Sequence, residues 1–123
     1  MARNGKVLLN YVITAPKEAV EEGKRIFRSH GPWMEATHPR EGEKALINYD
    51  VAIAPELSNP MDATSQPTGR TVFVLTEVYE SEAGVQHHFE LADSSWDDFG
   101  ALQAWLGRCE VAGFPAGGIV NSL

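Results

Sequence analysis

Two adjacent histidines, His87 and His88, stand in the segment TEVYESEAGVQHHFE (residues 76–90), which is typical of a strand end, a short turn and a helix. Neighbouring residues on a helix point about 100° apart, so the two imidazoles cannot face the same place. His88 shares its helix face with Val85 and Phe89 and is expected to point inward, whereas His87 falls on a more exposed side. An inward histidine either packs in the core or, because its ring exchanges a proton near neutral pH, acts in catalysis.

Polar residues that interrupt apolar strands are the other candidates for chemistry. Burying an amide or a carboxylate without a partner costs a few kcal/mol, so each must be hydrogen-bonded or face a wet cavity. The alternative is that they cap strand ends or lie at an exposed sheet edge. Tyr79, where its strand ends, would stand at the mouth of any space between sheet and helices, or be a core aromatic with its hydroxyl at the surface. The interrupting residues are Asn10, Asn48, Asp50 and Glu77.

The histidines and the cysteine do not predict a metal site. His30 and His38 fall on either side of an expected helix end, adjacent histidines do not chelate one ion, and Cys109 is the only cysteine. The sequence contains no GxSxG, P-loop or dinucleotide-binding glycine motif. Cys109 lies on the apolar face of an expected helix, and we expect it to be a small buried hydrophobic residue.

Hydrophobic periodicity predicts the elements that must position these side chains. The three prolines of residues 55–70 predict a long loop, which at this length is either functional or mobile. Expected strands are 6–14, 44–54 and 71–79, with a short edge strand broken by Pro115 in the tail; expected helices run from Pro16 to the GPW segment at 31–33, over 82–92 and over 94–110.

The order strand, helix, strand, strand, helices, strand is that of an α+β fold of the ferredoxin-like, split βαβ type with an antiparallel sheet. The first and third strands carry apolar side chains on both faces, but the helices can cover only one face. At about 25 cal/mol per Å² of apolar surface, leaving the second face in water would forgo several kcal/mol. A second copy of the chain could cover this second face without any further segment, so we expect an obligate homodimer.

Length and charge narrow the class of protein. The 123 residues correspond to one domain, and the net charge of −7 is concentrated between Arg70 and Arg108, where seven acidic residues and no Lys or Arg occur. Such a surface repels phosphate groups, so nucleic acid and membrane are poor partner candidates. No apolar run approaches the roughly 18 residues of a membrane span. The single cysteine and the lack of a signal peptide lead us to expect a cytoplasmic protein.

The segment VFVLTEVYESEAGVQHHFE resembles the strand–turn–helix signature of the antibiotic biosynthesis monooxygenase family, L-x-E-x-[YW]-x-[DS]-x-x-[AG]-x-x-x-H. The element order along residues 1–123 is also similar to that family's dimeric α+β barrel. The resemblance implies a homodimer with a pocket between the sheet and the helices of each subunit. The matching positions are Leu75, Glu77, Tyr79, Ser81, Gly84 and His88.

The best-studied members of that family oxidise phenolic or quinol substrates with O₂ and use no metal, flavin or other cofactor. On this resemblance His88 would be the base or proton shuttle, and Asn10 would hydrogen-bond the substrate oxygen or the developing peroxide. Tyr79 and Trp96 would shape the cavity. Glu77 and Asn48 are the further residues expected at the substrate.

Some members of the family degrade haem, with an asparagine on the first strand and a histidine ligand after the following helix. Asn10 matches the asparagine, but the corresponding region SSWDDF has no histidine, so haem is not expected. The expected activity is that of a cofactor-independent monooxygenase acting on a small aromatic, phenolic or quinol-like metabolite. The alternatives are a non-catalytic ligand-binding dimer and an isomerase-like enzyme on the same scaffold.

Overall fold

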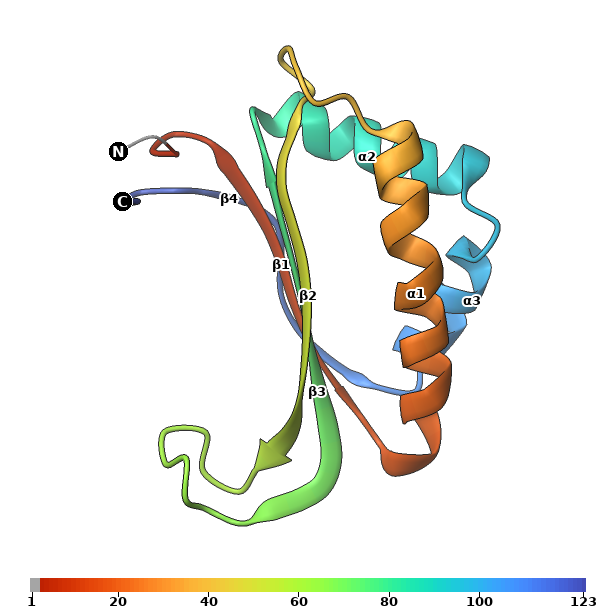
Figure 1. The fold of residues 1–123 in the computed structure, drawn as a ribbon, viewed down its shortest axis with the longest axis vertical. Coiled ribbons are helices and arrows are strands. Elements are labelled where there is room, and N and C mark those ends of the chain that lie inside the picture. Colours follow the sequence, from red (N-terminus) through yellow and green to blue (C-terminus); the bar gives the residue numbers. More distant parts are fainter. Residues whose placement is uncertain (1–2) are drawn as a thin grey trace.

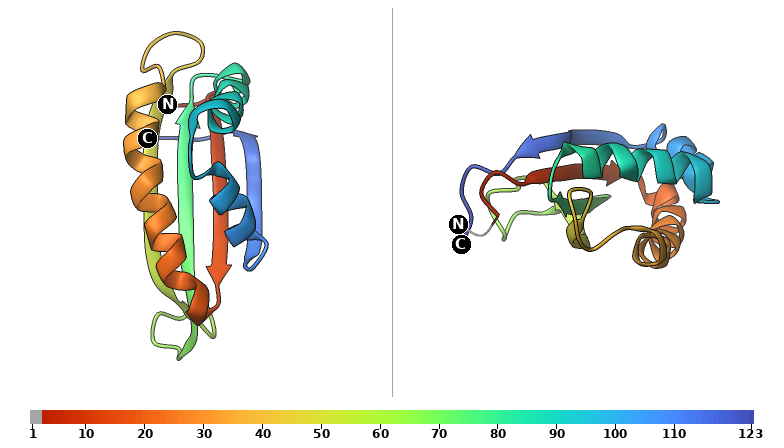
Figure 2. Two further views of the ribbon diagram at one scale, coloured as in Figure 1. Left: turned by 90° about the vertical axis from the view of Figure 1, so that its right-hand side faces the viewer. Right: turned by 90° about the horizontal axis from the view of Figure 1, so that it is seen from above.

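The computed structural model describes residues 3–123. An antiparallel sheet is covered on one face by all the helices (Figures 1 and 2). The strands are β1 (Val7–Ala15), β2 (Leu46–Leu57), β3 (Pro67–Tyr79) and β4 (Glu110–Gly118); the helical elements are the 3-10 turn η1 (Lys17–Ala19), α1 (Val20–Thr37), α2 (Glu82–Ser95) and α3 (Phe99–Leu106). None of the helices in this described part is long and apolar enough to cross a membrane.

The four strands follow the order β2-β3-β1-β4, and every neighbouring pair is antiparallel. The chain is therefore an α+β protein with an open four-stranded sheet, an arrangement consistent with the expected ferredoxin-like fold. The expected edge strand in the tail is confirmed, because β4 pairs only with β1 and contains Pro115, which an edge strand tolerates.

Strand alternation decides which side chains face the helices. In β1, Leu9 and Ile13 are buried in the core, and their register partners Glu77 and Phe73 on β3 point the same way. A close approach of α1 completes this layer, because Gly23 lies against the ring of Trp105, whose indole N–H donates to the carbonyl of Ala19 at 2.8 Å.

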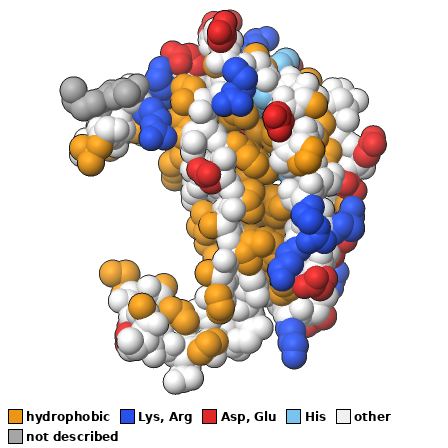
Figure 3. All heavy atoms as spheres, in the orientation of Figure 1, with side chains coloured by type: hydrophobic (Ala, Val, Ile, Leu, Met, Phe, Trp, Pro, Cys, Tyr) orange, Lys and Arg blue, Asp and Glu red, His pale blue; other side chains and the backbone are white. Residues whose placement is uncertain are grey.

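Within residues 3–123, no helix lies on the opposite sheet face. Its central strands present the alternate residues, such as the register pairs Val12–Val74 and Asn10–Thr76, and these side chains are only half-buried. Figure 3 shows hydrophobic side chains gathered in the hollow of this open face, between the chain termini and the turn that joins β2 to β3.

Helix α1 does not stop at the GPW segment, and the expected end at residues 31–33 is wrong. It continues through Pro32 to Thr37, which places the side chain of Met34 in the core with 1% exposure. A proline clashes with the Cβ of the preceding helical residue, and Gly31 has no Cβ. Burial of the last turn also offsets the roughly 3 kcal/mol that an interior proline costs.

The connection between β2 and β3 is shorter than the expected loop over residues 55–70. Both strands continue past their expected ends and leave residues 58–66 between them. Pro55 pairs with Thr71 in the edge strand β2, and Arg70 donates two hydrogen bonds to the Glu56 carboxylate at 2.8 and 3.0 Å. Residues 55–57 and 67–70 of the expected loop are thus an extension of the β-hairpin.

Candidate functional site

A cavity of about 300 Å³ lies between the sheet and the helices. This volume suits a small organic molecule, and the walls are mostly aliphatic and aromatic. The polar side chains on the walls include His30, His88 and Gln103. The full lining is Leu9, Tyr11, Ile13, Phe27, His30, Leu75, His88, Phe89, Ala92, Trp96, Phe99, Leu102, Gln103, Leu106 and Val111.

His88 reaches the cavity from α2, as the spacing of the helix predicts, and only 5% of it is exposed. The close approach of α2 to the sheet depends on Gly84, because a Cβ at this position would lie 2.8 Å from the ring of Tyr79. His87 is partly exposed and is not part of the cavity wall.

A chain of hydrogen bonds determines which nitrogen of His88 carries its proton. The Thr37 hydroxyl donates to the carbonyl of Trp33 at 2.7 Å, so its oxygen is left to accept from Nδ1–H of His38 at 3.0 Å. In neutral His38, Nε2 is then bare and accepts from Nδ1–H of His88 at 2.9 Å. The remaining nitrogen of His88, Nε2, therefore holds a free lone pair.

Burial keeps both members of this histidine pair neutral. It lowers the pKa of His38 to about 4, against the raising effect of a hydrogen bond with the Met34 backbone. It lowers the pKa of His88 to about 3, with a smaller lowering contribution from His38 and His30. The neutral rings that the proton assignment requires are therefore the forms present near neutral pH.

Glu77 of β3 lies beside this pair and is fully buried. Its Oε1 accepts a hydrogen bond from the Tyr79 hydroxyl at 2.5 Å and lies 3.6 Å from Nδ1 of His88. Its Oε2 has no hydrogen-bond partner among the residues that the structure describes. Burial raises the pKa of Glu77 to about 7, against the lowering effect of the bond from Tyr79.

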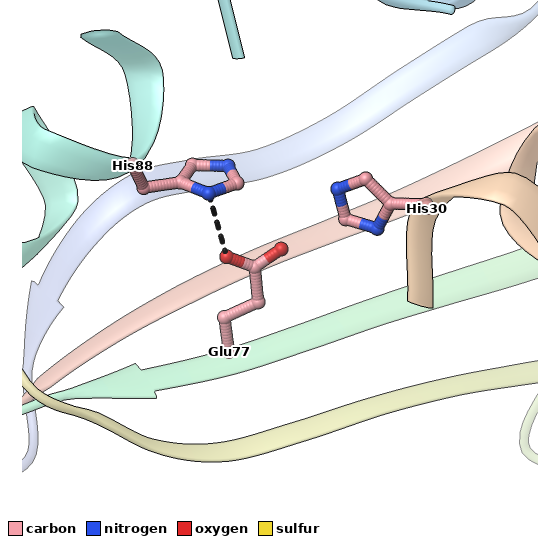
Figure 4. Close-up of side chains that lie close together, drawn as sticks. All are labelled: His30, Glu77 and His88. Atoms are coloured by element: carbon pink, nitrogen blue, oxygen red, sulfur yellow. Dashed lines mark ion pairs between the residues drawn. The ribbon is translucent and has the colours of Figure 1, made fainter. Parts of the chain in front are cut away.

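His30 of α1 faces the same point from the other side of the Glu77 carboxylate (Figure 4). Its Nδ1 is 2.8 Å from the hydroxyl of Tyr49, and burial lowers its pKa to about 3. One ligand atom from each of His30, Glu77 and His88 lies within 4.8 Å of the other two. These three residues are called the His30–Glu77–His88 cluster below.

Aromatic rings surround this cluster. Trp33 and Trp96 are stacked with their ring centroids 5.4 Å apart, and the ring of His30 lies 4.8 Å from that of Trp96. Both indoles are held by hydrogen bonds, since Trp96 donates to Ser29 and Trp33 donates to Ser95, each at 3.0 Å. The wall beside the cluster is therefore both apolar and fixed in position.

Four of the six expected site residues lie together on the helix-covered face: His88, Glu77, Tyr79 and Trp96. Tyr79 does not stand at a cavity mouth as expected. It is fully buried behind Glu77, because Gly84 brings α2 down onto its ring.

The other two expected residues, Asn10 and Asn48, lie on the open face. Asn10 alternates with the buried Leu9, and its amide donates to Thr76 at 3.1 Å. Asn48 pairs with Val78 and donates to the Asp50 carboxylate at 2.7 Å. Since successive strand residues point to opposite faces, neither amide reaches the cavity of its own chain.

Sequence reasoning missed the contributions of His30, His38 and Tyr49. His30 follows Ile26 and Phe27 at helical spacing, which was a signal that it points inward. The pairing of His38 with His88 had no local signal, because α1 was expected to end before His38.

No protein-family model matches this chain, and no curated protein sequence matches it.

Proposed function

We propose that the chain is an oxygenase that binds a small phenolic or quinol-like molecule in the cavity and uses His88 as the base. The observation that carries this proposal is the bare Nε2 of His88, on a ring that lines a largely apolar cavity. This is the chemistry implied by the resemblance of residues 75–88 to the antibiotic biosynthesis monooxygenases, and it requires no added cofactor.

The cavity supplies binding and excludes water. Its aliphatic and aromatic lining favours a flat apolar ring, and Gln103 offers an amide for a second polar group of the substrate. Removing water from around a phenolate makes it more readily oxidised, since the anion loses solvent stabilisation.

The first step transfers the phenol proton to Nε2 of His88. Because burial lowers the pKa of this ring to about 3, the transfer depends on groups that stabilise the imidazolium as it forms. The resulting imidazolium is stabilised by two groups that face its Nδ1–H, the acceptor nitrogen of His38 at 2.9 Å and the Glu77 carboxylate at 3.6 Å. In this scheme Glu77 acts through His88, so it is a positioning residue.

The second step uses O₂ as the oxidant. The phenolate passes one electron to O₂, and the superoxide and the substrate radical combine to form a C–O bond at a ring carbon. The peroxide takes the proton back from His88 and loses water as the ring C–H is broken. One phenol and one O₂ give one quinone and one water, so no external reductant is needed.

A second copy of the chain is proposed to cover the open face, as in a dimeric α+β barrel. The half-buried apolar side chains there, such as Val12 and Val74, support this assembly. Two sheets facing each other would bury them without any further segment. A cytoplasmic setting, which suits the free thiol of Cys109, belongs to the same proposal.

Oxygen consumption by the purified chain, with a panel of phenols and quinols and a chelator present, tests the activity. We expect His88→Asn, which keeps an N–H donor near the Nδ1 position but lacks the Nε2 base, to lower kcat by about 100-fold or more. The matched control His87→Asn should keep the activity. Ligand retention without turnover would overturn the proposal in favour of a binding protein, and product formed without O₂ uptake would indicate an isomerase.

A further inference from the structure

We infer that the His30–Glu77–His88 cluster binds one divalent transition-metal ion. Two imidazoles and one carboxylate are a donor set typical of zinc and of non-haem iron sites. The inference revises the expectation that the chain has no metal site. It does not depend on the proposed oxygenase activity.

The spacing of the donors is close to that of a bound site. With metal–ligand bonds of about 2.0–2.1 Å in a tetrahedral site, donor atoms lie about 3.3 Å apart. One possible ligand atom from each of the three residues lies within 4.8 Å of the other two. Binding an ion would shorten the widest donor separation by about 1.5 Å, which rotations of the three side chains can supply.

Each of the three residues is held by a partner on an atom that the ion would not use. The Tyr49 hydroxyl is hydrogen-bonded to Nδ1 of His30, and the Tyr79 hydroxyl donates a hydrogen bond to Oε1 of Glu77. Nε2 of His38 is hydrogen-bonded to Nδ1 of His88. Such outer partners orient the ligands of metal sites, and they leave Nε2 of both cluster histidines and Oε2 of Glu77 for the ion.

The unpartnered oxygen of Glu77 is the independent observation that points to a ligand. This Oε2 is fully buried and accepts no hydrogen bond among residues 3–123. A buried polar atom without a partner is costly, and the cost is larger for a charged carboxylate. No Lys or Arg forms an ion pair with Glu77 in this part of the chain, so a bound cation would supply the missing positive charge.

The ion would lie at the cavity wall, because both cluster histidines line the cavity. Three protein ligands leave a fourth position for water or a small molecule on the cavity side. The ion would also occupy the lone pair of His88 that the proposed base reaction needs. If both proposals hold, the metal-loaded chain is the inactive form, and a chelator restores turnover.

Metal binding to the untagged, chelator-stripped protein tests the site directly. We expect Zn²⁺ and Co²⁺ to bind with one ion per chain in calorimetry and to raise the melting temperature. Co²⁺ should also give the visible absorption of a site with nitrogen and oxygen ligands.

Ligand variants decide whether the ion sits at this cluster. Glu77→Gln keeps the side-chain shape, and His30→Asn keeps an N–H donor toward Tyr49, so both should fold while losing Co²⁺ affinity by more than about 100-fold. His87→Asn is the matched control and should bind as the parent chain does. Absence of Zn²⁺ and Co²⁺ binding at millimolar concentration, or unchanged affinity in both ligand variants, overturns the inference.

The two proposals fail separately. Turnover in chelator together with no metal binding would overturn only the metal site. Metal binding together with turnover that requires the metal would support the site and overturn the cofactor-free base reaction.

Discussion

His38 and His88 are fifty residues apart in the chain, yet their ring nitrogens share a hydrogen bond of 2.9 Å in the core. The bond joins the end of α1 to the middle of α2. Because Thr37 fixes the proton of His38, it also fixes the proton of His88. A hydroxyl one residue away from His38 thus controls the basic nitrogen at the cavity.

Replacing Thr37 by valine should leave the fold intact, but the ring protons of His38 and His88 should no longer be held on Nδ1. Without the acceptor oxygen, His38 is free to carry its proton on Nε2, and His88 must then move its own proton to the nitrogen that faces the cavity. We expect kcat to fall by about 10-fold or more with little change in KM. The ¹⁵N chemical shifts of the His88 ring report the exchange of tautomers.

Thr37→Ser is the matched control for that variant, since it keeps the hydroxyl and should keep both the rate and the ring shifts. If the valine variant retained the parent shifts, the hydrogen-bond chain would not set the tautomer of His88.

Acidification should destabilise the fold through its three buried histidines. Burial lowers the pKa of His30 and His88 to about 3 and that of His38 to about 4, whereas histidine in an unfolded chain titrates near about 6.5. Between these values the unfolded chain binds protons that the folded chain does not. The free energy of unfolding therefore falls as the pH is lowered from about 6.5 to about 4, by about 1.4 kcal/mol per pH unit for each net proton.

Glu77 opposes this trend but does not reverse it. Its folded pKa of about 7 lies above the ordinary value of 4.5 for a glutamate side chain, so the folded chain holds this proton longer in that window. Three histidines outnumber one glutamate. The neighbouring Tyr49 and Tyr79 have raised pKa values and stay neutral throughout. Urea unfolding at pH 7, 6 and 5 measures the slope; equal stability at the three values would contradict the prediction.

Gly23→Ala should destabilise the chain by about 1–3 kcal/mol, because an added methyl group overpacks the core. A Cβ at Gly23 would lie 2.3 Å from the ring of Trp105, which is 1% exposed and cannot move away easily. Gly100→Ala, on α3 with no atom within 4 Å of the added Cβ, is the control. It should be neutral or slightly stabilising, since alanine favours a helix. Thermal unfolding of the two variants checks both expectations.

Placing charges on the open face should dissociate the proposed dimer. Val12 and Val74 are register partners at the centre of that face, and the double variant Val12→Lys, Val74→Lys would put like charges opposite each other and opposite their copies. We expect a monomer by analytical ultracentrifugation at micromolar concentration.

Glu21→Lys, on the exposed face of α1, is the control for the charge change and should remain dimeric. A parent chain that is itself a stable monomer at micromolar concentration would rule out the assembly.

Local sequence patterns predicted the strands and their order well, because apolar residues repeat every second position and prolines and glycines separate the runs. They could not assign the faces of β1, since Leu9 and Leu8 are equally apolar and the alternation alone does not say which one meets the helices. For this reason Asn10 was expected at the substrate, whereas the structure places it on the open face.

The candidate site was predictable only in part. His88 and Glu77 were identified from a single segment of strand, turn and helix. The partners His30, His38 and Tyr49 come from other elements, and they meet that segment only through tertiary packing. Proline usually ends a helix, so the helix was expected to stop near Pro32 and His38 was not expected to lie beside His88. The burial of Met34, which favours continuing the helix past Pro32, comes from tertiary packing and is not visible in the local sequence.

The stacked pair of Trp33 and Trp96 gives the chain an optical signal of its own. Two indoles held face to face couple their strong transitions, so the far-ultraviolet circular dichroism should contain an exciton couplet that neither ring would give alone. Because His30 lies against Trp96, any guest that shifts this imidazole would also change the couplet. Circular dichroism of the unlabelled chain can therefore report whether a molecule is bound in the cavity.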